Sequence, residues 1–330
     1  MKNIYPIIAS AVLGVCLAGC NTLPNAESPE AGIAHVKVSV SGLPLTRVTG
    51  VSPADEVNIS SLQLFVFDGS GSLEYYVDAG ASATGTIAVK EGKKTVTAVI
   101  NAPSLSDIRS RSALLTKSTL LSDNAVGSFV MTGEVEAVLQ DGGKLSIEVS
   151  RIISKVTIKK ITSSFTSQSD ASKTFKINSI YLINVAGDNT YAASSEPTMW
   201  YNKLGNGQND ASLKSVPFLS DPVGKTVAYK SSYSVEHSFY CYPNLISTES
   251  FTPNWSPRHT MLVIDASLGG VQTYYPIELP VIGRNKSIVV ENLVITRKGS
   301  DYPYIPVPDG CDATVTVLPW DEILNYTETI

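Results

Sequence analysis

The sequence predicts an all-β protein of two β-sandwich domains with a small helical insertion. Three observations lead to this fold class. The apolar runs are short and rich in Val, Ile, Thr and Tyr, which are residues that favour strands. Turn-forming residues are plentiful, with 23 Gly and 18 Pro along the chain. A chain of 330 residues is also long enough for two ordinary domains, each with its own core.

Composition also narrows the class of function. Hydrophobic residues make up 43% of the chain and charged residues only 17%, a balance typical of globular proteins rather than disordered ones. The net charge is −5, and no Lys/Arg run marks a basic surface. We therefore expect no nucleic acid among the partners.

The first twenty residues predict the compartment. Lys2 precedes an uncharged apolar stretch, residues 4–18, that has the length of a signal-peptide core and is short for a membrane span. The stretch ends in Leu-Ala-Gly-Cys at residues 17–20, which matches the lipobox of bacterial lipoprotein precursors. We expect residues 1–19 to be a lipoprotein signal peptide and Cys20 to carry the lipid. The alternative is an ordinary signal peptide followed by a chance cysteine.

Cysteine chemistry then concerns two residues. Cys16 leaves with the signal peptide and Cys20 is lipidated, so Cys241 and Cys311 remain. An exported protein permits a disulfide between them, but two unpaired thiols are equally compatible with the sequence. Two distant cysteines without neighbouring histidines do not have the spacing of a metal site.

The first strand and the loop after it form a second candidate feature. Val36, Val38 and Val40 alternate with polar residues, which indicates a half-buried strand. Gly42 and Pro44 end the strand, and Arg47 follows in what should be an exposed loop.

A first β-domain follows, and a second begins near Arg151. Ser104 is the expected N-cap of a helix with Leu105, Ile108 and Leu115 on one face. The strands expected in the first domain are residues 62–67, 73–77, 86–89, 95–100, 129–131, 135–139 and 145–149. Those expected in the second are 156–158, 177–185, 237–242, 261–264, 273–279, 288–296 and 313–317, with a surface excursion at 187–215 and a linker at 298–309.

The motifs that would carry catalysis are not found in the sequence. Gly224-Lys225-Thr226 has Leu219 where a phosphate loop needs its first glycine, so we interpret it as a turn. His237 and His259 each lie beside an expected strand, where a structural role is the better interpretation. We therefore predict no enzyme, no catalytic residue, no metal and no cofactor.

Several local stretches, taken in order, resemble one known family. The stretches are Phe129 to Gly133, Val149 to Val156, Gly283 to Lys286, Leu293 to Thr296 and the final Trp320. Together with the lipobox and the alternating first and last strands, they resemble the major fimbrial subunit family of Bacteroidales, the fimbrillins of type V pilus stalks. The resemblance extends over essentially the whole chain and implies transthyretin-like sandwiches.

The resemblance also implies a mechanism. The lipidated precursor is exported to the outer membrane, and an Arg-specific protease cleaves the bond between Arg47 and Val48. Loss of residues 20–47 removes the Val36, Val38 and Val40 strand and leaves a groove that recruits a strand from a neighbouring copy. The strand offered is the one that carries Val315 and Val317. Repetition builds a cell-surface fimbria that serves adhesion, with anchor and tip subunits as further partners.

The implied organisation is a signal peptide at 1–19, a propeptide with the first strand at 20–47, and sandwich domains at 48–150 and 151–330. Residues 313–330 form the donor strand of the second domain. One alternative is a two-domain lipoprotein whose first and last strands complete its own sandwiches. Another is a permanently anchored lipoprotein, either a fimbrial anchor or tip subunit or a glycan binder that uses Trp200, Tyr201 and Trp255 as stacking platforms.

Overall fold

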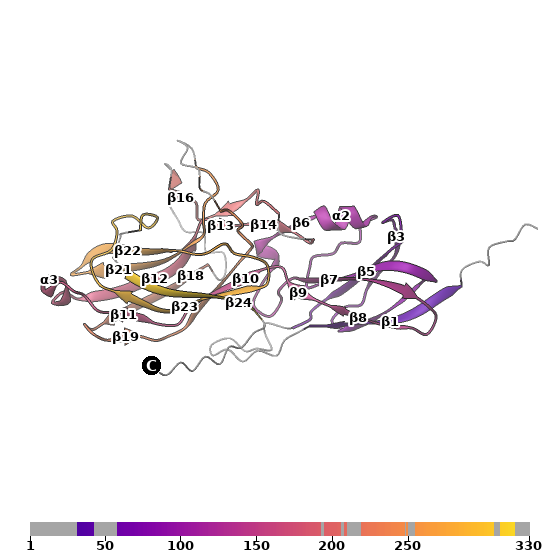
Figure 1. The fold of residues 1–330 in the computed structure, drawn as a ribbon, viewed down its shortest axis with the longest axis horizontal. Helices are drawn as coiled ribbons and strands as arrows, with labels where there is room; N and C mark the ends of the chain where they lie inside the picture. Colours follow the sequence, from indigo (N-terminus) through magenta and orange to yellow (C-terminus); the bar gives the residue numbers. More distant parts are fainter. Residues whose placement is uncertain are drawn as a thin grey trace, which may run out of the picture. The chain divides into compact units, whose positions relative to one another are not determined.

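β-Strands arranged in stacked sheets dominate the structure, a computed structural model, and the predicted all-β class is confirmed (Figure 1). The structure describes residues 32–42, 58–192, 195–205, 208–209, 219–247, 249, 255–306 and 311–320. Residues from Gly32 onward group into one compact unit. The helices in the described ranges are short, and none has the length and apolar character needed to cross a membrane.

The first sandwich packs a three-stranded sheet against a five-stranded one. The smaller sheet has the order β4-β1-β8, and the larger has the order β3-β2-β5-β7-β9. Alternating apolar residues on both sheets face one another, and Val36, Leu64, Val96 and Ile147 are among the fully buried members of this core. The strands are β1 (Ile33–Ser41), β2 (Leu62–Phe67), β3 (Leu73–Asp78), β4 (Thr84–Lys90), β5 (Gly92–Ile100), β7 (Met131–Leu139), β8 (Lys144–Glu148) and β9 (Ser150–Arg151).

The second sandwich is also built from two sheets. One has the order β19-β11-β23-β10-β20, with β24 paired to β23, and the other has the order β18-β12-β21-β22. Its core includes Val156, Ile180, Phe239 and Val290. The strands are β10 (Ser154–Ile158), β11 (Ile161–Ser163), β12 (Phe175–Ile183), β18 (Ser220–Val227), β19 (Ser232–Tyr233), β20 (His237–Cys241), β21 (Met261–Leu268), β22 (Val271–Glu278), β23 (Lys286–Ile295) and β24 (Cys311–Pro319).

The helical insertion exists but begins later than expected. Helix α2 spans Arg111–Thr116, and its N-cap is Ser110, whose side chain accepts a hydrogen bond from the backbone N–H of Ala113. Ser104 is not the cap, because the next residue, Leu105, donates its N–H to the side chain of Gln63 at 2.8 Å. Leu105 and Ile108 are buried as predicted, whereas Leu114 takes the buried position expected of Leu115.

The segment around Gly224 is strand rather than turn. Residues 220–227 form β18, which pairs with β12 except for a register shift opposite Asn178. Gly224 has φ +65°, a left-handed conformation that glycine adopts without strain. Glycine in this conformation is typical of a β-bulge, so a local turn signal here marks an irregularity inside a strand.

The expected surface excursion after Gly187 contains short strands. The shortest elements in the described ranges are β6 (Ser118–Leu120), β13 (Val185–Ala186), β14 (Asp188–Thr190), β15 (Trp200–Tyr201), β16 (Leu204–Gly205), β17 (Gln208–Asn209), η1 (Leu121–Asp123) and α3 (Gln168–Ala171). β14 pairs antiparallel with β6 of the helical insertion. The Tyr242 hydroxyl supports the same region by donating to the carbonyl of Leu120 at 2.9 Å. The excursion is therefore partly a structural connection between distant parts of the sequence.

Candidate functional site

The first candidate feature is β1, which lies between β4 and β8 and is paired along both edges. Figure 1 shows β1 beside β8. It runs antiparallel to β4, with Val36 opposite Ile87, and parallel to β8, with Val38 opposite Leu145. The N–H of Lys37 also donates to the carbonyl of Gly143 at 3.0 Å. Because both of its edges are bonded, β1 is the central strand of its sheet.

The inward side chains of β1 are almost completely buried. Ala34, Val36 and Val38 are at most 1% exposed and belong to the core of the first sandwich. Val40 was expected to match Val36 and Val38, but it is only half-buried at the end of the strand. The alternation therefore predicted the correct face, while the buried set is shifted by two residues towards Ala34.

Removal of β1 would expose one wall of this core. Each fully buried valine contributes roughly 1.5–3 kcal/mol relative to an exposed one. Two rows of backbone N–H and C=O groups, on β4 and on β8, would also lose their partners, at a net cost of about 0.5–1.5 kcal/mol for each bond. A sheet with such a gap is a template for an incoming strand.

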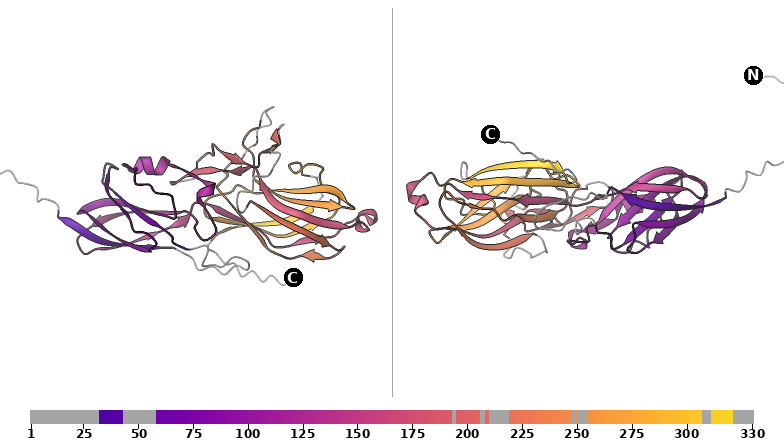
Figure 2. Two further views of the ribbon diagram at one scale, coloured as in Figure 1. Left: turned by 180° about the vertical axis from the view of Figure 1, so that it is seen from behind. Right: turned by 90° about the horizontal axis from the view of Figure 1, so that it is seen from below.

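The second candidate feature is β24, the last strand of the second sandwich. It pairs antiparallel with β23, with Val317 opposite Ile288 and a register shift between Val290 and Asn292. Among the described strands, β24 pairs with β23 alone, so it lies at a sheet edge. It is the yellow strand at the top of the right-hand view in Figure 2. None of the side chains from Cys311 to Pro319 is fully buried, and Val317 is 44% exposed.

β1 and β24 share one pattern of small and branched residues. The inward residues of β1 read Ala34, Val36 and Val38. In β24 the same spacing gives Ala313, Val315 and Val317. The two strands are also equally long, at nine residues each. The two strands are therefore similar in length and in the order of side-chain volumes along one face.

Three of the predicted site residues lie outside the described residues. These are the expected lipidation residue Cys20 and the two residues of the expected cleavage bond, Arg47 and Val48. The last ten residues of the expected donor segment, 321–330, also lie outside the described range. The roles of all of these residues stay predictions.

Cys241 and Cys311 are both unpaired. Cys241 is fully buried in β20, and burial raises the pKa of its thiol to about 12. Cys311 is half-buried at the start of β24, where burial and then the charge of Asp312 raise the pKa of its thiol to about 11. Both raised pKa values favour the protonated thiol at neutral pH.

The two histidines of the second sandwich each contact a carboxylate. His237 bridges β18 and β19, with Nδ1 2.9 Å from Asp221 Oδ2 and Nε2 2.9 Å from the Tyr233 hydroxyl. His259 lies against the carboxylate of Glu278. These contacts tie neighbouring strands together, which is the structural role expected for both histidines. Within the described ranges, no group of three or more His, Cys, Asp or Glu side chains could hold a metal ion.

Two of the three proposed sugar-stacking residues pack on each other. The Trp200 and Trp255 rings meet edge to face with centroids 5.3 Å apart, and the Lys203 ammonium lies 5.5 Å from the Trp255 ring centroid. Trp200, Tyr201 and Trp255 are all half-buried. Since a stacking platform needs an open ring face, this arrangement is closer to ordinary aromatic packing.

Two residues without a role predicted from the sequence, Trp320 and Arg284, are prominent in the structure. Trp320 is 4% exposed although it directly follows the exposed strand β24. Arg284 donates to the carbonyls of Tyr191 and Ala192 and to the hydroxyl of Thr132, and burial lowers the pKa of its guanidinium to about 10. The Pro-Trp pair after an alternating strand was the only available signal for Trp320. The contacts of Arg284 lie more than ninety residues away and leave no local signal.

Comparison with known families gives one match. Residues 34–172 match the model of the major fimbrial subunit protein (FimA) family. The match begins inside β1 and extends through the first sandwich into the second. This result confirms the family resemblance seen in the sequence, and the family is one of structural subunits rather than enzymes. None of the curated protein sequences matches the chain.

Solved structures share the fold along most of the chain. A candidate cell adhesion protein from Bacteroides eggerthii has a TM-score of 0.66 at 19% identity, covering 88% of this chain and 97% of that one. A fimbrilin from Porphyromonas gingivalis has a TM-score of 0.64 at 16% identity, covering 87% and 97%. The C-terminally truncated tip fimbrial protein Mfa3 from the same organism has a TM-score of 0.55 at 12% identity, covering 88% and 100%.

Proposed function

Because residues 34–172 match the model of the major fimbrial subunit family, we propose that the chain is the stalk subunit of a cell-surface fimbria that polymerises by strand exchange. In this proposal the precursor is exported as a lipoprotein anchored in the outer membrane through Cys20. An Arg-specific protease then cleaves after Arg47. The resulting filament serves adhesion and ends in separate anchor and tip subunits.

The observation that carries the proposal is the contrast between the two strands. β1 fills the middle of its sheet, and its inward side chains are buried, so its loss would leave a defined groove. β24 has the same length and the same order of Ala and Val, yet it lies at an edge with its side chains largely exposed. One strand therefore leaves a vacancy on removal, and the other is available to fill it.

The matching patterns also suggest a register for the exchange. If β24 enters the groove in the direction of β1, Ala313 takes the place of Ala34, Val315 that of Val36 and Val317 that of Val38. Thr314 and Thr316 would then replace His35 and Lys37, whose side chains are exposed in β1. The inserted strand would be parallel to β8 and antiparallel to β4 of the next subunit.

Head-to-tail repetition follows from this geometry. Each subunit offers its β24 to one neighbour and receives a β24 from another, so the contact is heterologous and does not close on itself. Such a contact generates an open filament when the rotation between successive subunits does not close them into a ring. The role of a stalk subunit follows from having both a groove and a donor strand.

A charge-placement experiment tests the donor assignment. The double variant Val315→Asp, Val317→Asp would place two charges in the apolar groove, and we expect no filaments by electron microscopy. The matched control, Thr314→Asp, Thr316→Asp, adds the same charge to the opposite face and should still assemble. Equal assembly of the two double variants would refute the insertion of Val315 and Val317.

The mature amino terminus tests the processing step. Mass spectrometry of the surface-exposed form should find Val48 as the first residue if β1 is removed. An acylated Cys20 in the assembled form would instead assign the chain to a permanently anchored role, as an anchor subunit or as a surface lipoprotein that binds another ligand.

A further inference from the structure

Trp320 differs from the rest of the carboxy-terminal segment in its burial. It is 4% exposed, whereas each side chain from Cys311 to Pro319 is half-buried or exposed. Val315 and Cys311 pack on the rim of the core, but Trp320 is a member of the core itself. Within residues 311–320, side-chain burial is therefore concentrated in the final indole.

The indole of Trp320 lies among residues from three separate parts of the chain. Its ring stacks on Tyr240 of β20 with centroids 5.8 Å apart, and it meets Phe129 at the same distance. The guanidinium of Arg151 lies 4.5 Å from the ring centroid. Aromatic pairs and a buried cation–π contact each add to the gain from area alone. The backbone N–H of Trp320 donates to the carbonyl of Asn285 at 3.1 Å, which fixes the end of the strand.

The other contacts of β24 are weaker. One edge of the strand is bonded to β23, and the ladder is interrupted by the register shift between Val290 and Asn292. The half-exposed side chains of the strand remove little apolar area from water. An edge strand with one irregular ladder opens more readily than a central strand, unless a buried side chain holds it.

We propose that Trp320 is the latch that keeps β24 on its own subunit, and that withdrawal of its indole controls how often the strand is free for exchange. This inference rests on the proposed function, in which β24 is donated. The latch keeps an unassembled subunit closed. When β24 leaves its own sheet, the indole of Trp320 and the rings of Phe129 and Tyr240 become exposed to water, which disfavours this open state. It also assigns control of assembly to a residue outside the Ala313, Val315 and Val317 face.

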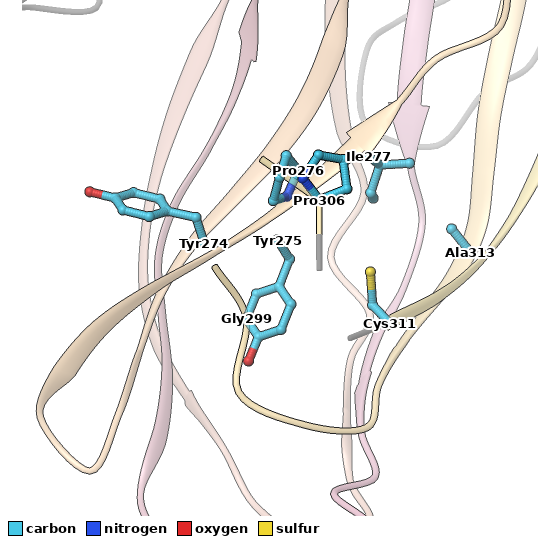
Figure 3. A pocket seen from close by; sticks show the side chains of 8 residues that line it. All are labelled: Tyr274, Tyr275, Pro276, Ile277, Gly299, Pro306, Cys311 and Ala313. Carbon is cyan, nitrogen blue, oxygen red and sulfur yellow. The ribbon is translucent and has the colours of Figure 1, made fainter. Parts of the chain in front are cut away.

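Cys311 provides a reporter for strand release at the opposite end of β24. Its side chain borders a hollow of about 170 Å³ beside Tyr275, Pro276 and Pro306, as the close-up shows (Figure 3). Burial raises the pKa of the thiol to about 11, against an ordinary value of 9.0. The thiolate is the reactive form, so at pH 8 the docked thiol should react more slowly than a released one.

The decisive experiment measures alkylation of Cys311 by iodoacetamide at pH 8 in the full chain, read by peptide mass spectrometry. Trp320→Ala should raise the labelling rate of Cys311 at least about tenfold, because removing a buried Trp shifts the opening equilibrium by more than this. Trp320→Phe keeps one ring and should give a smaller rise. The matched control Thr314→Ala changes an exposed residue on the outward face of the same strand and should stay within about threefold of the parent.

Cys241 monitors the integrity of the fold in the same samples, since it is fully buried in β20. An unchanged Cys311 rate in Trp320→Ala would overturn the latch. If Cys241 also becomes reactive in Trp320→Ala, Trp320→Phe decides: the latch is refuted unless its Cys311 rate rises while Cys241 stays protected.

Filament growth, measured on chains cleaved after Arg47, separates the latch from the proposed function. Faster labelling with faster growth supports both. Faster labelling of Cys311 without any growth would retain the latch and refute donation of β24. Faster growth without faster labelling would retain donation and refute the latch.

Discussion

Substitution of Ala313 by Phe tests the strand register most directly, because Ala313 is exposed in the docked strand. In the subunit itself the added ring should therefore change the free energy of unfolding by less than about 0.5 kcal/mol. In the proposed register, however, residue 313 takes the place of Ala34, which is 0% exposed and lies opposite Val89. A large ring does not fit there without displacing its neighbours.

The size of the effect follows from the cost of overpacking. Adding bulk to a closely packed core typically costs about 1–3 kcal/mol, which corresponds to a 5- to 150-fold weaker exchange contact. The effect recurs at every contact along a filament. We expect the Ala313→Phe chain to melt like the parent and to form few or no filaments in sedimentation and electron-microscopy assays after cleavage at Arg47.

Thr314→Phe is the matched control for Ala313→Phe. It adds a similar ring one residue later, on the face that would replace the exposed His35 side chain. It should assemble like the parent. If Thr314→Phe blocks assembly and Ala313→Phe does not, the register is displaced by one residue. If Val317→Phe is the blocking change instead, the strand enters in the opposite direction, since Val317 would then meet the position of Ala34.

Three further predictions concern anchoring, processing and stability. Cys20→Ala should abolish palmitate labelling and hold the precursor short of the outer membrane; normal labelling of this variant would refute the lipobox assignment. Arg47→Ala should yield a folded monomer that does not assemble, because β1 still occupies its sheet, and filaments equal to the parent's would show that opening at this bond is not the trigger. Gly133→Ala should lower the free energy of unfolding by about 2 kcal/mol or more in thermal melts, because a Cβ there would meet the carbonyl oxygen of Glu148 at 2.0 Å, whereas Gly69→Ala meets nothing within 4 Å and should be neutral.

The sequence predicted best those strands that are bounded by strong turns. β2 begins and ends where expected, at Leu62 and Phe67, because Asp68 to Gly71 closes the hairpin with the Asp68 carboxylate accepting from the N–H of Ser70. The side-chain bonds of Ser70 and the backbone N–H of Ser72 lower the pKa of Asp68 and keep it charged. Local chemistry of this kind is complete within a few residues, so it can be read without the fold.

The features that sequence analysis placed wrongly depend on distant partners. Ser104 has the residues of a helix start after it, but Gln63 captures the N–H of Leu105 and delays the helix to Arg111. Gly224 has the residues of a turn, but pairing with β12 keeps the chain extended on both sides of it. In both cases a tertiary contact overrides a valid local preference.

In the candidate site, too, the features set by local pattern were predicted and those set by distant contacts were not. Alternation alone identified the inward face of β1, and it matched that face to the residues of β24. It did not predict that Val40 is only half-buried, since this depends on where β4 ends its pairing at Thr84. Nor did it predict the burial of Trp320, since Phe129, Arg151 and Tyr240 lie far away in the sequence.

The free-energy balance of the proposed strand exchange depends on Trp320. On insertion, β24 would gain a second backbone ladder, at about 0.5–1.5 kcal/mol for each bond, and would bury Val315 and Val317 more fully. It would lose the ladder with β23 and the site of Trp320, and removing a buried Trp typically costs about 3–5 kcal/mol. In the proposed register Trp320 follows the buried part of the groove, at the position of the exposed Ser41, so that contact is not recovered there. Side chains alone therefore leave the exchange nearly balanced, and the second ladder provides the driving force.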